Sequence, residues 1–372
     1  MVQLSSISAS ERLDRLRLIR SENVGPVTWR QIMERYGSAG AGLDALPELA
    51  RRGGRKKPIK ICPKPEAEDE MAAIEAAGAH LLTLGEAEYP VAMAVIYDAP
   101  PVLTILGHAH LLLRRAVGIV GARNASAAGV RFTREIAAGL GAQDLVVVSG
   151  LARGIDGAAH QGALASGTIA VVAGGVDVVY PSEHQALYEQ ICDQGVIVAE
   201  QPITTKPQGR HFPRRNRLIS GLSLGVVVIE AALKSGSLIT ARMALEQGRE
   251  VMAVPGSPLD PRCRGTNDLL RQGATLVENA GDVIEAIGGM ILSQADEPQS
   301  ELFSSAKTAD PSPQELESAR GLVHEKLGPT PVSVDELMRQ CHLTPAVVFT
   351  ILLELELAGR LERHPGNMVS LL

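Results

Sequence analysis

The sequence predicts an α/β protein whose centre is a Rossmann-like, doubly wound and mostly parallel sheet. Between residues 102 and 288, short apolar segments rich in Val and Ile alternate with glycine turns and helix-like segments. Glycine accounts for 37 of the 372 residues and aromatic residues for only 3%, which is typical of tight βα turns and aliphatic packing. In such a sheet, we expect ligands at the carboxyl ends of the strands.

Four segments follow from the pattern along the chain. Residues 1–80 contain apolar residues at helical spacing and predict a small helical domain, within which the basic residues 51–64 are expected to form a linker. Residues 81–288 form the α/β domain. Residues 289–313 are rich in Ser, Pro and Gln, a composition typical of a linker.

The last segment, residues 314–372, predicts a winged helix. It contains three amphipathic or apolar helices and a Pro-Gly-Asn turn between two short strands. Thr344 and Pro345 are expected to begin the third helix. That helix is apolar and acidic, so we expect it to pack or to contact protein rather than to present Arg, Lys, Asn or Gln to DNA bases.

Seven strands are predicted in the α/β domain, because seven β-branched segments are too short to be helices and are followed by turn residues. They are residues 102–106, 116–120, 145–149, 168–173, 196–199, 225–230 and 250–254.

The charge distribution permits a polyanionic partner although the net charge does not suggest one. Acidic residues number 42 and basic residues 36, so the net charge is −6. Residues 206–217, however, hold five basic and no acidic residues, and residues 51–64 hold seven basic and no acidic ones. Local potential decides where a phosphate backbone binds.

Cysteine spacing and hydropathy indicate a cytoplasmic protein. The four cysteines are scattered, which predicts neither a disulfide framework nor a zinc site. No apolar run approaches the roughly 18 residues of a membrane span, and the N-terminus lacks a signal-peptide pattern. We expect no membrane association, no metal and no cofactor.

Two glycine turns between a strand and a helix are candidate phosphate sites. The first contains Gly121, Arg123 and Ser126, and the second contains Gly150 and Arg153. Glycine permits close backbone approach, a helix N-terminus supplies free N–H groups, and arginine adds a cation. A tight turn with a solvated arginine is the alternative. The first turn matches neither a P-loop nor a dinucleotide fingerprint.

Asp156 and His160 follow the second turn and lie four residues apart, on one helix face. This spacing suits a catalytic pair, but we expect both side chains to make structural hydrogen bonds.

The third candidate site combines cations with an aromatic ring, a pattern typical of single-stranded nucleic acid binding. The alternative is a solvated cationic turn with the ring in the core. The residues are Arg210, Phe212, Arg214, Arg215, Asn216 and Arg217.

A fourth turn holds Lys234 and Ser235 before a helix that leads to Arg249. Four such turns at one edge of a sheet would form a groove that follows a phosphodiester backbone.

These motifs resemble the DNA-processing protein A family (DprA, also called Smf). The resemblance covers residues 119–274 and rests on strings that include IVGARNAS, SGLARGIDGAAHQGAL, HFPRRNRLISGLS and GTNDLLRQGA. The N-terminal segment is similar to the family's sterile-alpha-motif-like domain, and the C-terminal segment to its winged-helix domain.

The resemblance implies a function without catalysis. Members bind single-stranded DNA, protect incoming DNA and help to load the recombinase RecA in natural transformation. They form homodimers through the Rossmann-like domain.

Two motifs carry over, with departures. The family's G-S-R loop corresponds to Gly121-Ala122-Arg123, so Ala122 replaces the usual Ser. The R-N-R segment corresponds to Arg215-Asn216-Arg217. After Tyr180-Pro181, many members carry a Lys where this chain has Ser182 and Glu183.

The alternative function is that of a nucleotide phosphoribohydrolase of the lysine-decarboxylase-like type. Such an enzyme would use a P-G-G-x-G-T loop with a paired Glu and Arg. Here residues 173–181 are AGGVDVVYP, without the G-T pair or a following Glu.

Overall fold

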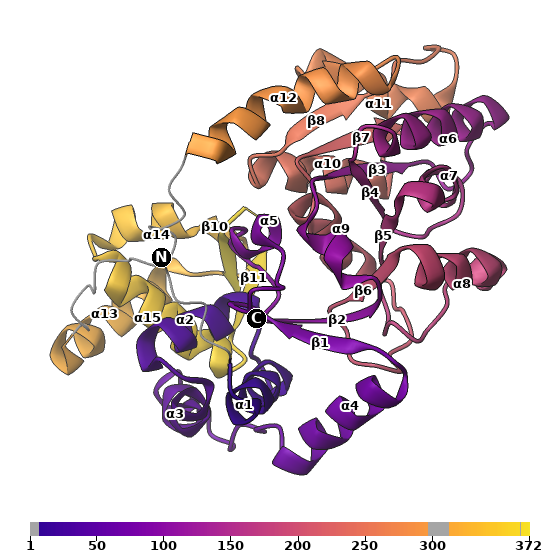
Figure 1. The fold of residues 1–372 in the computed structure, drawn as a ribbon. Helices are drawn as coiled ribbons and strands as arrows, with labels where there is room; N and C mark the ends of the chain where they lie inside the picture. The colour runs from indigo at the N-terminus through magenta and orange to yellow at the C-terminus, as the bar shows by residue number, and fades with distance from the viewer. Residues whose placement is uncertain (1–6, 297–311, 365) are drawn as a thin grey trace. The chain divides into compact units, whose positions relative to one another are not determined.

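The computed structural model describes residues 7–296, 312–364 and 366–372 and divides into two compact units (Figure 1). The first combines the chain up to Asp69 with the chain from Gln299 onward, and we call it the terminal unit. The second spans Glu70–Pro298, and we call it the sheet unit. The four-segment division predicted above stays a prediction.

The sheet unit is built on nine strands in the order β1-β2-β6-β5-β4-β3-β7-β8-β9. The seven strands from β3 to β9 are parallel, whereas β1 and β2 are antiparallel at one edge. Their bounds are β1 (His80–Thr83), β2 (Val102–Gly107), β3 (Ala116–Gly121), β4 (Val146–Ser149), β5 (Thr168–Val171), β6 (Val196–Ala199), β7 (Gly225–Ile229), β8 (Glu250–Ala253) and β9 (Thr275–Leu276).

Helices cover both faces of this sheet. They are α4 (Lys64–Ala76), α5 (Val91–Ala94), η1 (Ala109–Leu113), α6 (Ala127–Gly141), α7 (Ile155–Ala163), η2 (Leu164–Ser166), η3 (Ser182–His184), α8 (Gln185–Gln194), α9 (His211–Gly221), α10 (Gly236–Glu246), η4 (Pro261–Cys263), α11 (Arg264–Arg271) and α12 (Ala280–Asp296). One core cluster joins α6, α7 and α12 to β3, β4 and β7, and another joins α8 to β5 and β6. Because both faces are covered, the strands are continuously apolar.

The predicted doubly wound fold is confirmed, with three local differences. Strands β1 and β9 were not predicted, because four and two residues carry too little pattern. Helix α12 continues to Asp296, so the first residues of the predicted linker 289–313 are helical. Residues 297–311 of that linker lie outside the described residues.

The terminal unit contains both ends of the chain. Its helices and strands are α1 (Ala9–Arg20), α2 (Pro26–Tyr36), α3 (Ala39–Arg52), α13 (Pro313–Lys326), β10 (Val332–Ser333), α14 (Val334–Cys341), α15 (Pro345–Leu357), β11 (Leu361–His364) and β12 (Met368–Leu371). The three short strands form a sheet in the order β10-β12-β11. As predicted, Thr344 is the N-cap of α15 and Pro345 its first residue.

Helix α15 is a packing helix, as its composition predicts. Its Glu354 is only 1% exposed and pairs with Arg320 on α13 at 3.0 Å. The helix also contacts α3, and the side-chain amide of Asn23 donates to the carbonyl oxygen of Leu357 at 3.2 Å. A Cβ atom on Gly53 would lie 1.9 Å from the carbonyl oxygen of Glu354. The two ends of the chain therefore share one tightly packed interface.

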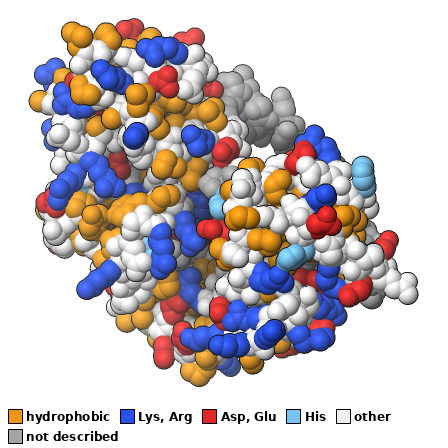
Figure 2. Space-filling model, turned by 180° about the vertical axis from the view of Figure 1, so that it is seen from behind, with side chains coloured by type: hydrophobic (Ala, Val, Ile, Leu, Met, Phe, Trp, Pro, Cys, Tyr) orange, Lys and Arg blue, Asp and Glu red, His pale blue; other side chains and the backbone are white. Residues whose placement is uncertain are grey.

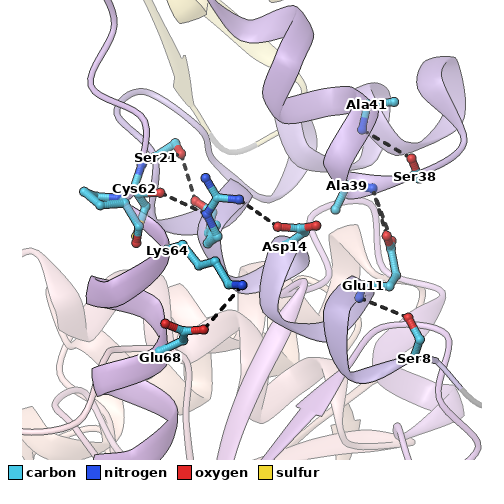
Figure 3. A network of polar contacts seen from close by, with 12 residues as sticks. Ser8, Glu11, Asp14, Ser21, Ser38, Ala39, Ala41, Cys62, Lys64 and Glu68 are labelled. Atoms are coloured by element: carbon cyan, nitrogen blue, oxygen red, sulfur yellow. Dashed lines mark hydrogen bonds and ion pairs between the residues drawn. The ribbon is translucent and has the colours of Figure 1, made fainter.

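Residues 51–64 are not the free linker that their composition predicts. Figure 3 shows Cys62 against Ser21, with the backbone N–H of Cys62 donating to the Ser21 hydroxyl at 3.1 Å. Arg17 donates to the carbonyl oxygen of Cys62 at 3.2 Å and pairs with Asp14 at 2.8 Å. Polar contacts to α1 and to the turn after it fix a segment that composition alone could not place.

Within the described ranges, no single helix is long and apolar enough to cross a membrane. Helices α14 and α15 pass the same test only when taken together, and the chain bends by 119° at the break between them.

Replacing Gly53 with Ala should destabilise the terminal unit by about 1–3 kcal/mol, because the added Cβ overpacks against the α15 backbone. The φ of Gly53 is −70°, so Ala meets no backbone strain there. Urea unfolding followed by the fluorescence of Trp29, the one tryptophan in the sequence, reports on this unit.

Gly321→Ala on α13 is the matched control. Nothing lies within 4 Å of a Cβ at that position, so helix propensity should raise stability by roughly 0.5–1 kcal/mol. Equal effects of the two substitutions would contradict the close α3–α15 packing.

Candidate functional site

A cleft of about 410 Å³ lies beyond the carboxyl ends of β3, β4 and β5, where the fold leads us to expect a ligand. The loops after these three strands and the start of α9 line it. The lining residues are Arg123, Asn124, Gly150, Ala152, Arg153, Val172, Ala173, Gly174, Val178, Tyr180, Pro181, Pro207, Phe212 and Arg215. Three arginines from separate sequence motifs are thus brought together.

An aromatic and cationic group lies at the cleft. The guanidinium carbon of Arg123 is 5.2 Å from the centre of the Phe212 ring. The ring of Tyr180 is 5.7 Å from that of Phe212, at an angle of 56°. Tyr180 is 49% exposed and Phe212 is half-buried, so the alternative of Phe212 in the core is wrong. Together these side chains offer π-faces and positive charge to a planar anionic ligand.

Arg215 lines the same cleft and is only 6% exposed. It donates from Nη1 to the carbonyl oxygen of Val171 at 2.6 Å, and a Cβ on Gly150 would lie 1.8 Å from that nitrogen. Burial lowers the pKa of Arg215 to about 10, while the carboxylate of Asp156 opposes the shift. Arg215 therefore stays cationic at neutral pH.

The Asp156 carboxylate fixes the turn after β4. It accepts hydrogen bonds from the backbone N–H groups of Gly150 at 3.2 Å and Ala152 at 3.3 Å. Burial raises the pKa of Asp156, and the Arg215 cation and the two backbone donors oppose that shift.

His160 is fully buried and supports the same turn. Its Nε2 accepts from the backbone N–H of Leu151 at 3.3 Å, and its Nδ1 lies 2.8 Å from the hydroxyl of Thr168. Burial, with smaller contributions from His184 and Arg215, lowers the pKa of His160 to about 3. The expectation that Asp156 and His160 make structural hydrogen bonds is confirmed.

The predicted phosphate site at Ser126 is filled by a side chain of the protein itself. The backbone N–H of Ser126 donates to Glu230 at 2.8 Å, and its hydroxyl bonds the other oxygen of the same carboxylate. Ser126 also caps α6 through the N–H of Gly129 at 2.9 Å. A Cβ on Gly121 would lie 1.9 Å from the carbonyl oxygen of Ile229, so this glycine permits strand packing. Of this turn, only Arg123 and Asn124 reach the cleft.

The basic residues 206–217 lead into helix α9, and the turn of the helix places some of their arginines at the surface and others in the interior. Arg210 and Arg214 are exposed. Arg217 is buried, pairs with Asp98 at 3.3 Å and also pairs with Glu200. Asn216 donates to the carbonyl oxygen of Gly236 at 3.3 Å. Burial tends to lower the pKa of Arg217, but the two carboxylates outweigh it and raise that pKa. Arg217 is therefore an internal ion-pair partner and not a free cation.

The fourth predicted turn does not line the cleft. Ser235 caps α10 through the N–H of Ser237, and Lys234 is exposed. Arg249 is buried and donates to the carbonyl oxygens of Ala92 at 2.6 Å and Gly221 at 3.3 Å. The predicted groove of four turns is thus, in the structure, a cleft made by the loops after β3, β4 and β5 together with α9.

Sequence analysis noted Tyr180 and Glu183 as part of a departure from the family, but it did not place Tyr180 in the site or predict the partner of Glu183. Tyr180 belongs to an aromatic-proline pair in a glycine-rich loop, and that pair is the signal that could have identified it. Glu183 forms an ion pair with Arg153, which places a negative charge beside a predicted DNA contact.

The fold and this cleft define a Rossmann-like protein with a cationic, aromatic-lined binding site and an internal carboxylate where a nucleotide phosphate would otherwise bind. The chain belongs to the DNA recombination-mediator protein A family, whose sequence model matches residues 80–288. Models of a DprA-like N-terminal HHH domain and of a DprA winged helix domain match residues 9–73 and 307–367. The N-terminal helical domain is therefore described as an HHH domain rather than as a sterile-alpha-motif-like domain.

Relatives include Protein Smf of Escherichia coli K12, which is 36% identical over 312 residues, or 83% of this chain and 82% of that protein. DNA processing protein DprA of Bacillus subtilis is 44% identical over 220 residues, or 58% of this chain and 74% of that protein. The phosphoribohydrolase alternative is not favoured.

Solved structures of two relatives are similar. DprA from Streptococcus pneumoniae has a TM-score of 0.60 at 34% identity and covers 74% of this chain and 95% of its own. DNA processing protein A from Helicobacter pylori, described for its single-stranded DNA binding mode, has a TM-score of 0.52 at 29% identity and covers 58% and 96%.

The structural role of His160 predicts a pH effect on stability. Its pKa falls from 6.5 to about 3 on folding, so the unfolded chain binds more protons between these values. Stability should therefore fall as pH falls below 6.5, by up to about 1.4 kcal/mol per pH unit. Urea unfolding of wild type and His160→Gln across this range measures the difference. Asp156 titrates with the opposite sign but is present in both proteins. Parallel curves would contradict a buried neutral His160.

Proposed function

We propose that this chain binds single-stranded DNA in the cleft between the loops after β3, β4 and β5 and the start of α9. The observation that carries the proposal is the contact of Phe212 with Arg123 and with Tyr180 in the cleft that buried Arg215 also lines. Phe212 and Tyr180 stack with unpaired bases, and Arg123 and Arg153 contact phosphates. Stacking accepts every base, so binding has no strong sequence preference. The Helicobacter pylori relative is named for the same ligand.

The other residues predicted to contact DNA have two different roles in this proposal. Arg210, Arg214 and Lys234 are exposed cations outside the cleft lining, and they add to the positive potential around it. The remaining predicted contacts support the surrounding backbone. They are Gly121, Ser126, Gly150, Asn216, Arg217 and Arg249. The protein has no catalytic activity in this proposal, since Asp156 and His160 are engaged with backbone and hydroxyl groups.

We further propose that the protein acts in the cytoplasm, where it protects incoming DNA and helps to load the recombinase RecA in natural transformation. The family description as a recombination mediator supports this role. Four free cysteines, three of them buried, are typical of a reducing compartment.

A homodimer through the sheet unit is part of the same proposal. Leu259, in the loop after β8, is 90% exposed, and Leu276 on the edge strand β9 is 48% exposed. An edge strand with an exposed apolar side chain is suited to pairing with a second copy.

Substitution of the cleft residues tests the DNA proposal. Phe212→Ala should weaken binding of a fluorescent oligothymidine by about 1–3 kcal/mol, because one base loses its stacking partner. Arg123→Ala should lower the salt slope of binding by about 0.7, since one phosphate contact is lost. Arg131→Ala, an exposed arginine on α6, is the control. Wild-type affinity and slope in both cleft variants would refute the proposed site.

The Arg153–Glu183 ion pair gives a prediction of opposite sign. Both side chains are partly exposed, at 63% and 45%, so the ion pair is weak and is screened by salt. Glu183→Gln frees Arg153 and removes a charge that repels phosphate, so single-strand affinity should rise a few-fold in anisotropy titrations. Glu135→Gln, which makes the same charge change on α6 beside Arg131, should have no effect. An equal gain in both variants would show that net charge alone is responsible.

A further inference from the structure

The basic segment 51–64 has no part in the cleft function proposed above. It holds seven basic and no acidic residues and belongs to the terminal unit, whereas the cleft lies in the sheet unit. On one side of the terminal unit, Figure 2 shows a row of Lys and Arg side chains. A concentration of like charge destabilises a fold through self-repulsion, so its presence needs a reason.

The structure holds the backbone of this segment in a closed loop around Glu22, in the turn after α1. The Glu22 carboxylate accepts from Nη2 of Arg55 at 2.7 Å and from the backbone N–H of Lys60 at 3.0 Å. The backbone N–H of Glu22 donates to the carbonyl oxygen of Lys60 at 3.0 Å. Nε of Arg55 donates to the carbonyl oxygen of Lys57 at 3.0 Å. Buried Ile59 anchors the loop, so its shape is fixed before any partner binds.

The fixed loop presents three lysines to solvent. Lys56, Lys57 and Lys60 are all exposed, and among the described residues none forms an ion pair with their amines. The carboxylate of Glu22 is already engaged by Arg55 and the Lys60 backbone. These contacts lower the pKa of Glu22, so it remains ionised and keeps the loop closed.

The neighbouring cations are only weakly neutralised. Arg51 and Arg52 share Glu48 at 2.8 Å and 2.9 Å, and Lys64 lies 3.6 Å from Glu68. These side chains are largely exposed, and exposed pairs are weak and screened by salt. The segment around the three lysines therefore keeps an excess of positive charge.

We propose that this lysine loop, residues 53–63, is a second nucleic-acid-binding surface that contacts the phosphate backbone through Lys56, Lys57 and Lys60. The segment contains no aromatic residue, so it cannot stack on bases. A protein interface needs large apolar or aromatic anchors at its centre, but in residues 53–63 Ile59 is buried, Ile61 is half-buried, and the exposed apolar side chains are the two small prolines, Pro58 and Pro63. A loop that offers charge alone binds single strands and duplexes alike, without base preference.

The test compares Lys56→Gln/Lys57→Gln/Lys60→Gln with a charge-matched control, Arg131→Gln/Lys326→Gln/Arg339→Gln, whose three side chains are exposed on other helices. Affinities for a mixed-sequence duplex and for oligothymidine are measured at several salt concentrations. In the loop variant, the salt slope should fall by roughly 2–3 for the duplex and about 2 for oligothymidine. The control variant should retain the wild-type slopes.

Phe212→Ala separates this surface from the cleft. It should weaken oligothymidine binding and leave the salt slope of duplex binding unchanged. Its loss of binding free energy for oligothymidine should add to the loss caused by the loop variant. An unchanged duplex slope in the loop variant, or the same decrease in the control, would overturn the proposal even if the cleft binds as described. Competition by polyglutamate as effective as competition by duplex would overturn it too, because the loop would then serve any acidic partner.

Discussion

The cleft depends on one buried cation, the guanidinium of Arg215. It lies where a Cβ at Gly150 would lie, bonds the end of β5 through the carbonyl oxygen of Val171, and experiences the field of Asp156. A buried charge is costly unless it is compensated, so the turn after β4, the end of β5 and helix α9 must keep one arrangement. That arrangement positions Phe212 on α9 against Arg123, which follows β3.

The sequence predicted the central fold well because the parallel strands are buried on both faces. Val117, Val147 and Val227 are fully buried, so the strands read as continuous apolar segments, and these match the observed strands to within two residues. Short edge strands carry no comparable pattern. The loop around Glu22 was mistaken for a linker, because its order comes from hydrogen bonds to α1 and the following turn that composition does not encode.

The site was predicted in part, and the failures share a physical cause. Arg123, Arg153, Phe212 and Arg215 meet at one cleft, as expected from the carboxyl ends of parallel strands. Other predicted contacts, such as Arg217, are buried because they pair with acceptors distant in sequence, here Asp98 and Glu200. Glu230 likewise occupies a helix N-terminus that looked open. Local sequence identifies a cation or an N–H group, but only the tertiary structure shows whether its partner is already present.

The packing of α3 on α15 also has a consequence for synthesis. The amide of Asn23 bonds a carbonyl oxygen 334 residues further along the chain. Helix α3 therefore completes its packing only after α15 has been made, and the whole Rossmann-like sheet is synthesised in between. A chain without its winged helix leaves the face around Gly53 without its packing partner, so the terminal unit cannot reach its packed state until that domain has been synthesised.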